Sequence, residues 1–179
     1  MLVKDYTIKD KNIVLKNHFE YGYLKDFIEI ANDKEFEFLL MSHNFPYPYT
    51  EEDANFFINK NRENGNEIFA IDFYIFYHDN IAGVIGISNI DYINMRGHIG
   101  YWIGKKFRNK GIATESVNIM MNFAKNELRL HSLYTTVLTD NVKSINVLLK
   151  NHFEITGIDK DTFYYRNNFY SAYLLSRIL

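Results

Sequence analysis

Apolar and polar positions along the first 60 residues predict one strand and several helical stretches. An apolar run within residues 11–17 predicts the strand. The stretches 21–31 and 33–41 are amphipathic, and apolar residues recur at helical spacing in the first, so both predict helices. Residues 45–49 are not expected to be helical, because each of the two prolines disfavours helix in the residue before it.

A helix is predicted to begin at Thr50. The threonine hydroxyl can cap the helix, and Glu51, Glu52 and Asp53 fill its first turn, where the helix dipole favours negative charge. Asp53 occupies the position of the capping-box partner, with a shorter side chain than the usual Glu or Gln. The start of this helix is therefore encoded locally.

The pattern beyond residue 66 changes from strand period to helix period and back. The predicted elements are strands at 67–77, 81–90 and 97–104, a helix at 112–128, a strand at 132–138, a helix at 142–150 and two strands within 153–176. Asp79-Asn80 is the predicted turn of the first hairpin, and 166–168 that of the last. This order predicts a mixed α/β (α+β) domain rather than a doubly wound one.

Composition limits the classes of function. The chain has 179 residues, so one domain over 1–179 is expected, and its net charge of −2 with no long basic run does not favour nucleic acid as a partner. The absence of cysteine excludes a disulfide framework and a thiol nucleophile, and it fits a cytoplasmic protein. No signal-sequence core, no membrane span and no metal are expected, because long apolar runs and paired histidines do not occur.

The junction between the strand at 97–104 and the helix at 112–128 is the most informative segment. The first N–H groups of a helix lack intrahelical partners, and together with the helix dipole they bind anions. Gly111 allows a phosphate to approach the backbone closely, and small Ala113 keeps the helix start clear. Four basic residues add positive charge: Lys105, Lys106, Arg108 and Lys110. A phosphate-binding turn is predicted, although a solvated basic loop would show the same pattern.

Several segments, in the same order, resemble GNAT-superfamily N-acetyltransferases, and most closely the branch that acetylates ribosomal-protein alanine and serine N-termini. The segments are His98–Gly104, Arg108–Glu115, Phe45–Thr50 with Ala54, Ala82–Ile87, and Asp140–Lys150 followed by Phe153. The resemblance covers about residues 11–176. It implies a GNAT-like, mostly antiparallel central sheet with splayed strands, flanked by helices, and acetyl-CoA as the co-substrate, with no metal.

The resemblance also implies where the cofactor lies. The strands at 97–104 and 132–138 would splay apart, with the pantetheine arm between them, and Gly100 is compatible with a bulge at the splay. The cofactor-binding residues implied are Tyr101, Trp102, Ile103, Arg108, Asn109, Lys110, Gly111, Ile112, Ala113, Thr114 and Asn141.

Two side chains are candidates for proton transfer. By resemblance, Ser144 would protonate or stabilise the leaving thiolate; the alternative is a polar residue in the first turn of a helix capped by Asp140 or Asn141. His98 stands where the family often carries Glu, and its ordinary pKa suits a general base; the alternative is a partly buried strand residue. The sequence departs from the family at His152, where a glycine is usual, and at Ser171, where an aspartate is usual.

The acceptor and the assembly remain open in the sequence. The prediction is an N-acetyltransferase acting on a primary amine, in the first place a protein N-terminal α-amino group. The alternatives are an acetyltransferase of small amines such as aminoglycosides or polyamines, a module that binds coenzyme A without catalysis, and an interaction protein without a cofactor. The aromatic segment 45–49 would either line the acceptor site or pack in the core. A homodimer would be unsurprising for this family.

Overall fold

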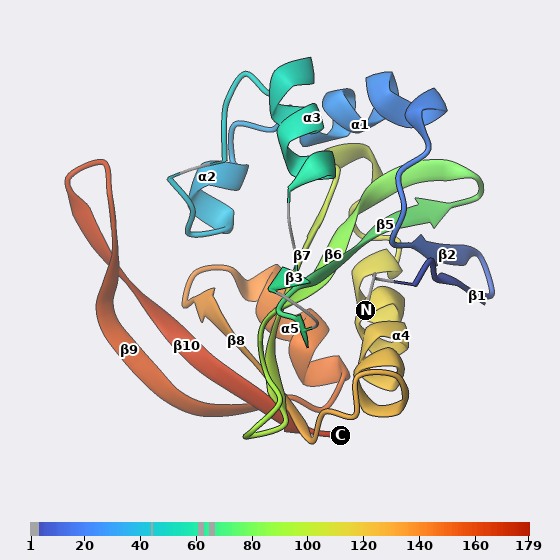
Figure 1. The fold of residues 1–179 in the computed structure, drawn as a ribbon. Helices are drawn as coiled ribbons and strands as arrows, with labels where there is room; N and C mark the ends of the chain where they lie inside the picture. Colours follow the sequence, from blue (N-terminus) through green and yellow to red (C-terminus); the bar gives the residue numbers. More distant parts are fainter. Residues whose placement is uncertain (1–3, 44, 61–62, 65–66) are drawn as a thin grey trace.

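The fold is an eight-stranded sheet with helices on both faces (Figure 1). The computed structural model describes residues 4–43, 45–60, 63–64 and 67–179; residues 1–3, within the segment where no signal sequence is expected, lie outside them. The strands are β1 (Thr7–Asp10), β2 (Ile13–Lys16), β5 (Ile71–Tyr77), β6 (Asn80–Asp91), β7 (Arg96–Ile103), β8 (Ser132–Leu138), β9 (Glu154–Tyr165) and β10 (Asn168–Ile178). Their order is β1-β2-β5-β6-β7-β8-β10-β9. Only β7 and β8 run parallel among these neighbours, so the predicted mixed, mostly antiparallel sheet is confirmed.

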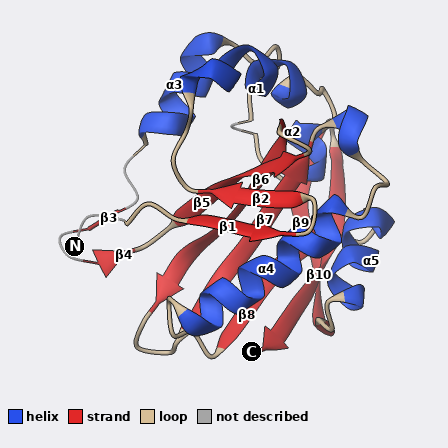
Figure 2. Cartoon of the chain, turned by 90° about the vertical axis from the view of Figure 1, so that its right-hand side faces the viewer, coloured by secondary structure: helices blue, strands red, loops and turns tan. Residues whose placement is uncertain are grey.

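The helices cover the two faces unequally (Figure 2). One side carries η1 (Tyr21–Tyr23), α1 (Leu24–Ala31), α2 (Phe36–Leu39) and α3 (Glu51–Asn59), and the other carries α4 (Ile112–Asn126) and α5 (Val142–Lys150). Trp102 on β7 packs on Phe27 of α1, with ring centroids 5.8 Å apart. On the opposite face Phe73 of β5 meets Phe123 of α4 at 5.0 Å. A short pair, β3 (Glu63–Asn64) and β4 (Glu67–Ile68), lies outside the main sheet.

The apolar periodicity of the sequence correctly predicted the helices and strands between residues 112 and 150. The predicted bounds of β8 and α5 are confirmed, and α4 ends two residues before the predicted limit. The capping box at Thr50 is also confirmed, because its hydroxyl accepts from the Asp53 N–H at 3.3 Å and the Asp53 carboxylate accepts from the Thr50 N–H at 2.8 Å.

Three predicted details are wrong. The two hairpin turns each end one residue earlier than predicted. The first turns at His78 and Asp79, which both have positive φ (47° and 61°), so Asn80 already belongs to β6, and Asn168 likewise already belongs to β10. The strand predicted at 67–77 is divided, since its first residues form β4 outside the main sheet. The edge strand β1 was not predicted at all, because its four residues are exposed or half-buried and include two charges. Where these strands begin and end depends on their pairing with other strands, which local periodicity does not encode.

The sheet opens between β7 and β8. Their parallel pairing is limited to residues 96–98 of β7 and 132–134 of β8, and ends at His98 opposite Tyr134. Beyond this point β7 stays paired with β6 as far as Ile103, while β8 follows β10. The implied splay is therefore present. The implied bulge at Gly100 is wrong: Gly100 lies in regular register opposite Gly86, and the one register shift of this pair falls nearer the β6–β7 turn.

Candidate functional site

A cleft of about 1520 Å³ follows the splay between β7 and β8. Its walls come from β7, the loop into α4, the end of β8 and α5, with α1 and α2 opposite. Twelve of the thirteen predicted site residues line it: His98, Tyr101, Trp102, Ile103, Arg108, Asn109, Gly111, Ile112, Ala113, Thr114, Asn141 and Ser144. Lys110 does not. The structure thus brings together residues that are as far as 46 positions apart, from His98 to Ser144.

The first turn of α4 is open toward the cleft. Gly111 is the N-cap with φ of 79°, and the first intrahelical bond runs from the Glu115 N–H to the Gly111 carbonyl. No described side chain caps this end, so the N–H groups of residues 112–114 remain available to an anion. A Cβ on Gly111 would meet nothing within 4 Å, so the glycine serves the left-handed backbone rather than packing.

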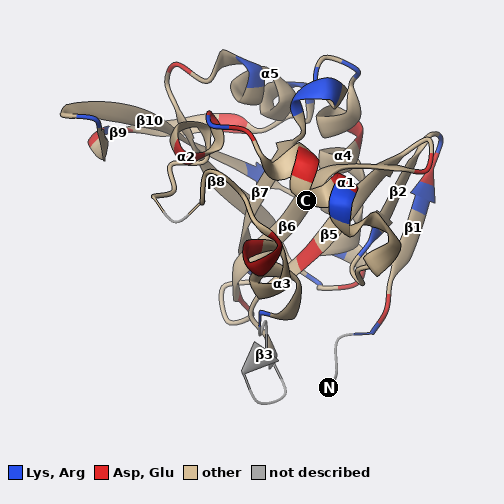
Figure 3. Cartoon of the chain, turned by 90° about the horizontal axis from the view of Figure 1, so that it is seen from above, with Lys and Arg blue, Asp and Glu red and all other residues tan. Residues whose placement is uncertain are grey.

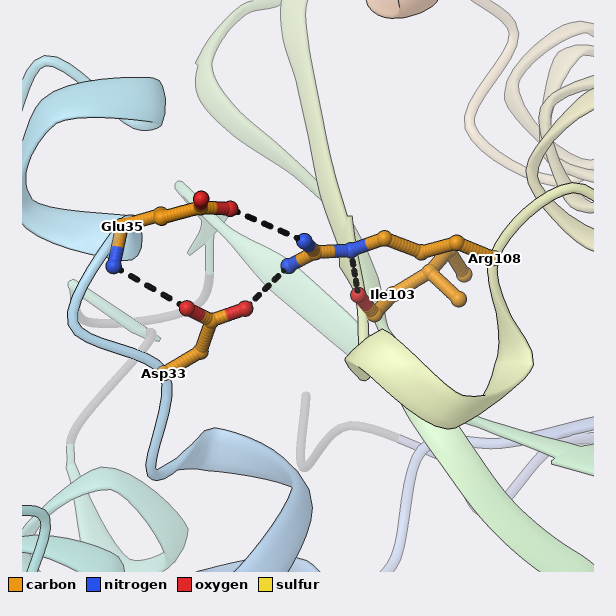
Figure 4. A network of polar contacts seen from close by, with 4 residues as sticks. All are labelled: Asp33, Glu35, Ile103 and Arg108. Carbon is orange, nitrogen blue, oxygen red and sulfur yellow. Dashed lines mark hydrogen bonds and ion pairs between the residues drawn. The ribbon is translucent and has the colours of Figure 1, made fainter.

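The Arg108 side chain, predicted to add positive charge to the turn, forms a clamp with two carboxylates (Figure 4). Its guanidinium bonds the Asp33 carboxylate at 2.6 Å and the Glu35 carboxylate at 3.3 Å, while Nε donates to the Ile103 carbonyl at 3.0 Å. It therefore ties the loop between α1 and α2 to the end of β7, and its charge is already matched by carboxylates.

The positive charge of the loop is correspondingly smaller than its four basic residues suggested. Lys106 pairs with Glu29 of α1 at 2.8 Å, and Lys110 lies 5.5 Å from the centre of the Phe107 ring. Viewed from above, basic and acidic segments are interspersed among the described residues (Figure 3). An anion at this turn would be held mainly by backbone N–H groups and the dipole of α4.

Ser144 and Tyr101 form a hydroxyl pair beside the splay. Their oxygens lie 2.9 Å apart, and the Tyr101 hydroxyl is also 3.3 Å from the Ser144 carbonyl. Burial raises the pKa of Tyr101 to about 12, against the opposing effect of the Ser144 hydrogen bond, so the phenol stays protonated at neutral pH. The Asn141 amide oxygen caps α5 by accepting from the Ser144 N–H at 3.2 Å. The capping arrangement weighed as the alternative exists, and the hydroxyl nonetheless lines the cleft.

His98 faces the opposite side of β7 from Tyr101, because side chains alternate along a strand. Its ring is half-buried, lies edge-on to Tyr134 at 5.5 Å, and has Nδ1 3.5 Å from the Ser88 hydroxyl. Burial lowers the pKa of the imidazole below its ordinary value. A neutral ring with a free lone pair is thus favoured at pH 7, as a proton acceptor requires.

Some aromatic residues of the segment 45–49 pack in the core, and one lines the cleft. Phe45 packs on Phe36 at 5.2 Å and Tyr49 is buried, whereas Tyr47 is 55% exposed and lines the cleft. Across the cleft, Tyr165 at the tip of the β9–β10 hairpin donates to Glu37 of α2 at 3.1 Å. Sequence reasoning missed Tyr165, since only the tertiary fold brings it to α2.

The two departures from the family pattern have different consequences. His152 takes the left-handed conformation (φ 61°) that ends α5, and the Phe153 N–H bonds the Leu148 carbonyl at 3.1 Å, so the helix terminates as a Schellman motif without glycine. Ser171 accepts from the Asp161 N–H at 3.1 Å within the β9–β10 hairpin and does not line the cleft.

Asn151 is a further residue that sequence reasoning missed. It is buried, and its amide donates to the carbonyls of Thr114 at 3.1 Å and Val147 at 2.9 Å. It therefore joins the first turn of α4 to α5. Among the described residues, no three His, Asp or Glu side chains gather as a metal site requires, and no helix is long and apolar enough to cross a membrane.

Comparisons with known proteins agree with this geometry. The family described as acetyltransferase (GNAT) domain matches residues 14–154. YdaF of Bacillus subtilis, named as a candidate ribosomal N-acetyltransferase, is 32% identical over 78 residues, which are 44% of this chain and 43% of that protein, so the match spans less than half of its length. A ribosomal-protein-serine acetyltransferase of Escherichia coli is 26% identical over 142 residues, 79% of each chain. The structure of RimL, a ribosomal-protein α-N-acetyltransferase, in complex with coenzyme A superposes with a TM-score of 0.83 at 20% identity, over 97% of this chain and 98% of that one.

Proposed function

This chain belongs to the GNAT acetyltransferase family, and on that premise we propose that it transfers an acetyl group from acetyl-CoA to a primary amine. The observation that carries the proposal is the open first turn of α4 beside the β7–β8 splay, both within one cleft. A protein N-terminal α-amino group is the first candidate acceptor, supported by the names of the two sequence relatives.

The cleft has the features that acetyl-CoA requires. The N–H groups of residues 112–114 suit a pyrophosphate, and the open space over Gly111 leaves room for it. Past His98, the edge of β7 no longer pairs with β8, so backbone groups at 101–103 are available to the amides of the pantetheine arm. The Asn141 Nδ2 group can donate to the arm, since Oδ1 already caps α5.

The reaction forms a C–N bond and breaks the C–S bond of the thioester. The attacking amine must lose a proton, and His98, which lines the cleft, is the proposed acceptor, directly or through water. The Ser144 hydroxyl stabilises the leaving thiolate by donating a hydrogen bond to it, and solvent water then supplies the proton of the free thiol. The Tyr101 hydroxyl oxygen lies 2.9 Å from the Ser144 hydroxyl oxygen, and this hydrogen bond orients the serine side chain.

Two alternatives are separated by experiment. A polyamine acceptor would need several acidic residues free to bind it. In this cleft Glu29, Asp33 and Glu35 pair with Lys106 and Arg108, which leaves Asp140 among the lining carboxylates. A module that only binds coenzyme A would bind acetyl-CoA and acetylate neither an N-terminal peptide nor a small amine. Screening both amine classes for coenzyme A release distinguishes the three.

The proposal is tested by isothermal titration with acetyl-CoA of the unmodified protein and of Ala113→Glu. The glutamate places bulk and negative charge at the open turn, so the Kd should rise at least about tenfold. Asn118→Glu is the matched control: it adds the same charge on an exposed position of α4 outside the cleft and should leave the Kd unchanged. No binding by the unmodified protein, or equal binding by all three, would refute the site.

We also propose a cytoplasmic setting, supported by the absence of cysteine, and a homodimer, supported by the family resemblance alone. Sedimentation equilibrium of the purified protein measures the second: a mass near that of one 21.3 kDa chain contradicts it.

A further inference from the structure

Gly100 is an unexplained glycine in the middle of a central strand. Glycine weakens a strand interior, and it is usually retained where a turn, a bulge or a close approach needs it. Its φ lies outside the left-handed region, and its pairing with Gly86 is regular. No turn and no bulge therefore accounts for it.

Packing within the protein does not account for Gly100 either. A Cβ on Gly97, three residues earlier on β7, would approach Ile87 to 2.6 Å, so that glycine is required by the core. A Cβ on Gly100 would meet only the His98 Cε1 atom, at 3.8 Å, which is an ordinary contact. Among the described strand glycines, Gly157 alone shares this freedom, with Leu174 at 3.5 Å. Gly100 thus leaves space that the fold does not use.

That space lies on the same face of β7 as the candidate base. Gly100 lines the cleft and shares a face of β7 with His98 and Trp102, the face toward α1 and α2. Tyr101, which contacts Ser144 on the thiol side, points to the other face. The space over Gly100 is therefore next to the candidate base and away from the group that serves the thiolate.

The residues next to Gly100 on β6 and β5 determine which polar groups lie near this space. Gly86 is directly opposite Gly100, and a Cβ there would overlap the Asp72 carboxylate, which lies over Gly86 and pairs with Lys60 at 3.7 Å. Opposite residues of antiparallel strands have Cα atoms about 5 Å apart. The charge of Asp72 is matched by Lys60, so the His98 imidazole is the group beside Gly100 that suits an amine, as an acceptor for its proton.

We propose that Gly100 is the floor of the acceptor pocket, and that its missing side chain makes room for the substituent on the carbon that bears the acceptor amine. The inference rests on the proposed acetyl transfer and adds to it a determinant of acceptor shape. A methyl group at this position would compete with that substituent and would leave an unbranched amine carbon room to bind.

The test compares Gly100→Ala with the unmodified protein on two synthetic peptides that differ only in their first residue, serine or glycine. Serine branches the carbon that bears the α-amino group, and glycine does not. We expect kcat/KM for the serine peptide to fall about tenfold or more and that for the glycine peptide less than about threefold, as is typical for one carbon in a tight pocket. Gly157→Ala, the same change on a strand outside the cleft, should alter neither value. For a small-amine acceptor, sec-butylamine and butylamine form the equivalent pair.

The outcomes separate the two proposals. Equal losses for both acceptors, or none, would overturn the role of Gly100 while acetyl transfer stands. A matching loss of acetyl-CoA affinity in Gly100→Ala, measured by titration, would place the space on the cofactor side and would also overturn it. If the unmodified protein acetylates no member of either pair, the proposed transfer fails, and the inference about Gly100 falls with it.

Discussion

The clamp made by Arg108 offers a quantitative test of how this cleft is held together. Its guanidinium and the Asp33 carboxylate are 19% and 9% exposed, whereas the Glu35 carboxylate is 60% exposed. A hydrogen bond between charged, largely buried groups contributes about 1.5–3 kcal/mol, and an exposed pair about 0–1 kcal/mol. Arg108→Ala should therefore lower the free energy of unfolding by about 3 kcal/mol, because it also removes the bond to the Ile103 carbonyl.

Two further variants resolve the contributions. Asp33→Asn keeps an oxygen for the Glu35 N–H, which Asp33 Oδ1 accepts at 3.0 Å, but it places an NH2 group where Oδ2 now accepts from Arg108. The charge and this hydrogen bond are both lost, so a loss of about 2 kcal/mol is expected. Glu35→Gln should change stability by less than about 0.5 kcal/mol.

Urea unfolding of the single variants and of the Arg108–Asp33 double variant gives the coupling energy between the two residues. A value of about 1–2 kcal/mol is expected at low salt. Strict additivity of the two single losses, within about 0.5 kcal/mol, would show that the guanidinium does not act through Asp33 and would refute the clamp.

Three other changes probe the helix ends and the candidate base. His152→Gly should raise the free energy of unfolding by about 1 kcal/mol, because glycine takes the left-handed conformation that ends α5 without strain; urea unfolding checks this, and a loss would contradict it. Thr50→Ala should lower thermal stability by about 1 kcal/mol through loss of the capping box, while Thr50→Ser should retain it. The pKa of His98 is lower in the folded protein than unfolded, so the unfolded chain binds more protons below about pH 6.5 and stability falls as the pH drops through that range. His98→Gln should therefore lose less thermal stability than the unmodified protein between about pH 7 and pH 5, and parallel curves would contradict the shift.

The local sequence pattern predicted most of the helices and strands. Of the candidate site, it predicted the open helix turn but not the side-chain pairings. The bounds of β8 and α5 follow from apolar periodicity, and the open turn at Gly111 follows from residue type and position between a strand and a helix. The partner of Arg108 is 75 positions away and that of Tyr101 is 43 away, so neither pairing leaves a local signal. The sequence predicts that the Arg108 side chain adds positive charge to the turn, and only the structure shows that its buried partner Asp33 matches that charge.

Because side chains alternate along β7, the two groups proposed to take part in the reaction lie on opposite faces of this strand. Tyr101 points toward α5 and holds the Ser144 hydroxyl, while His98 points to the side of α1 and α2. The strand separates from β8 directly after His98, so the edge of β7 between His98 and Tyr101 is open to a ligand. The proposed donor for the thiolate and the proposed acceptor for the amine proton therefore lie on opposite faces of β7. A one-residue slip of β7 would reverse both faces, and the regular β6–β7 ladder, from Gly83 opposite Ile103 to Ser88 opposite His98, holds that register.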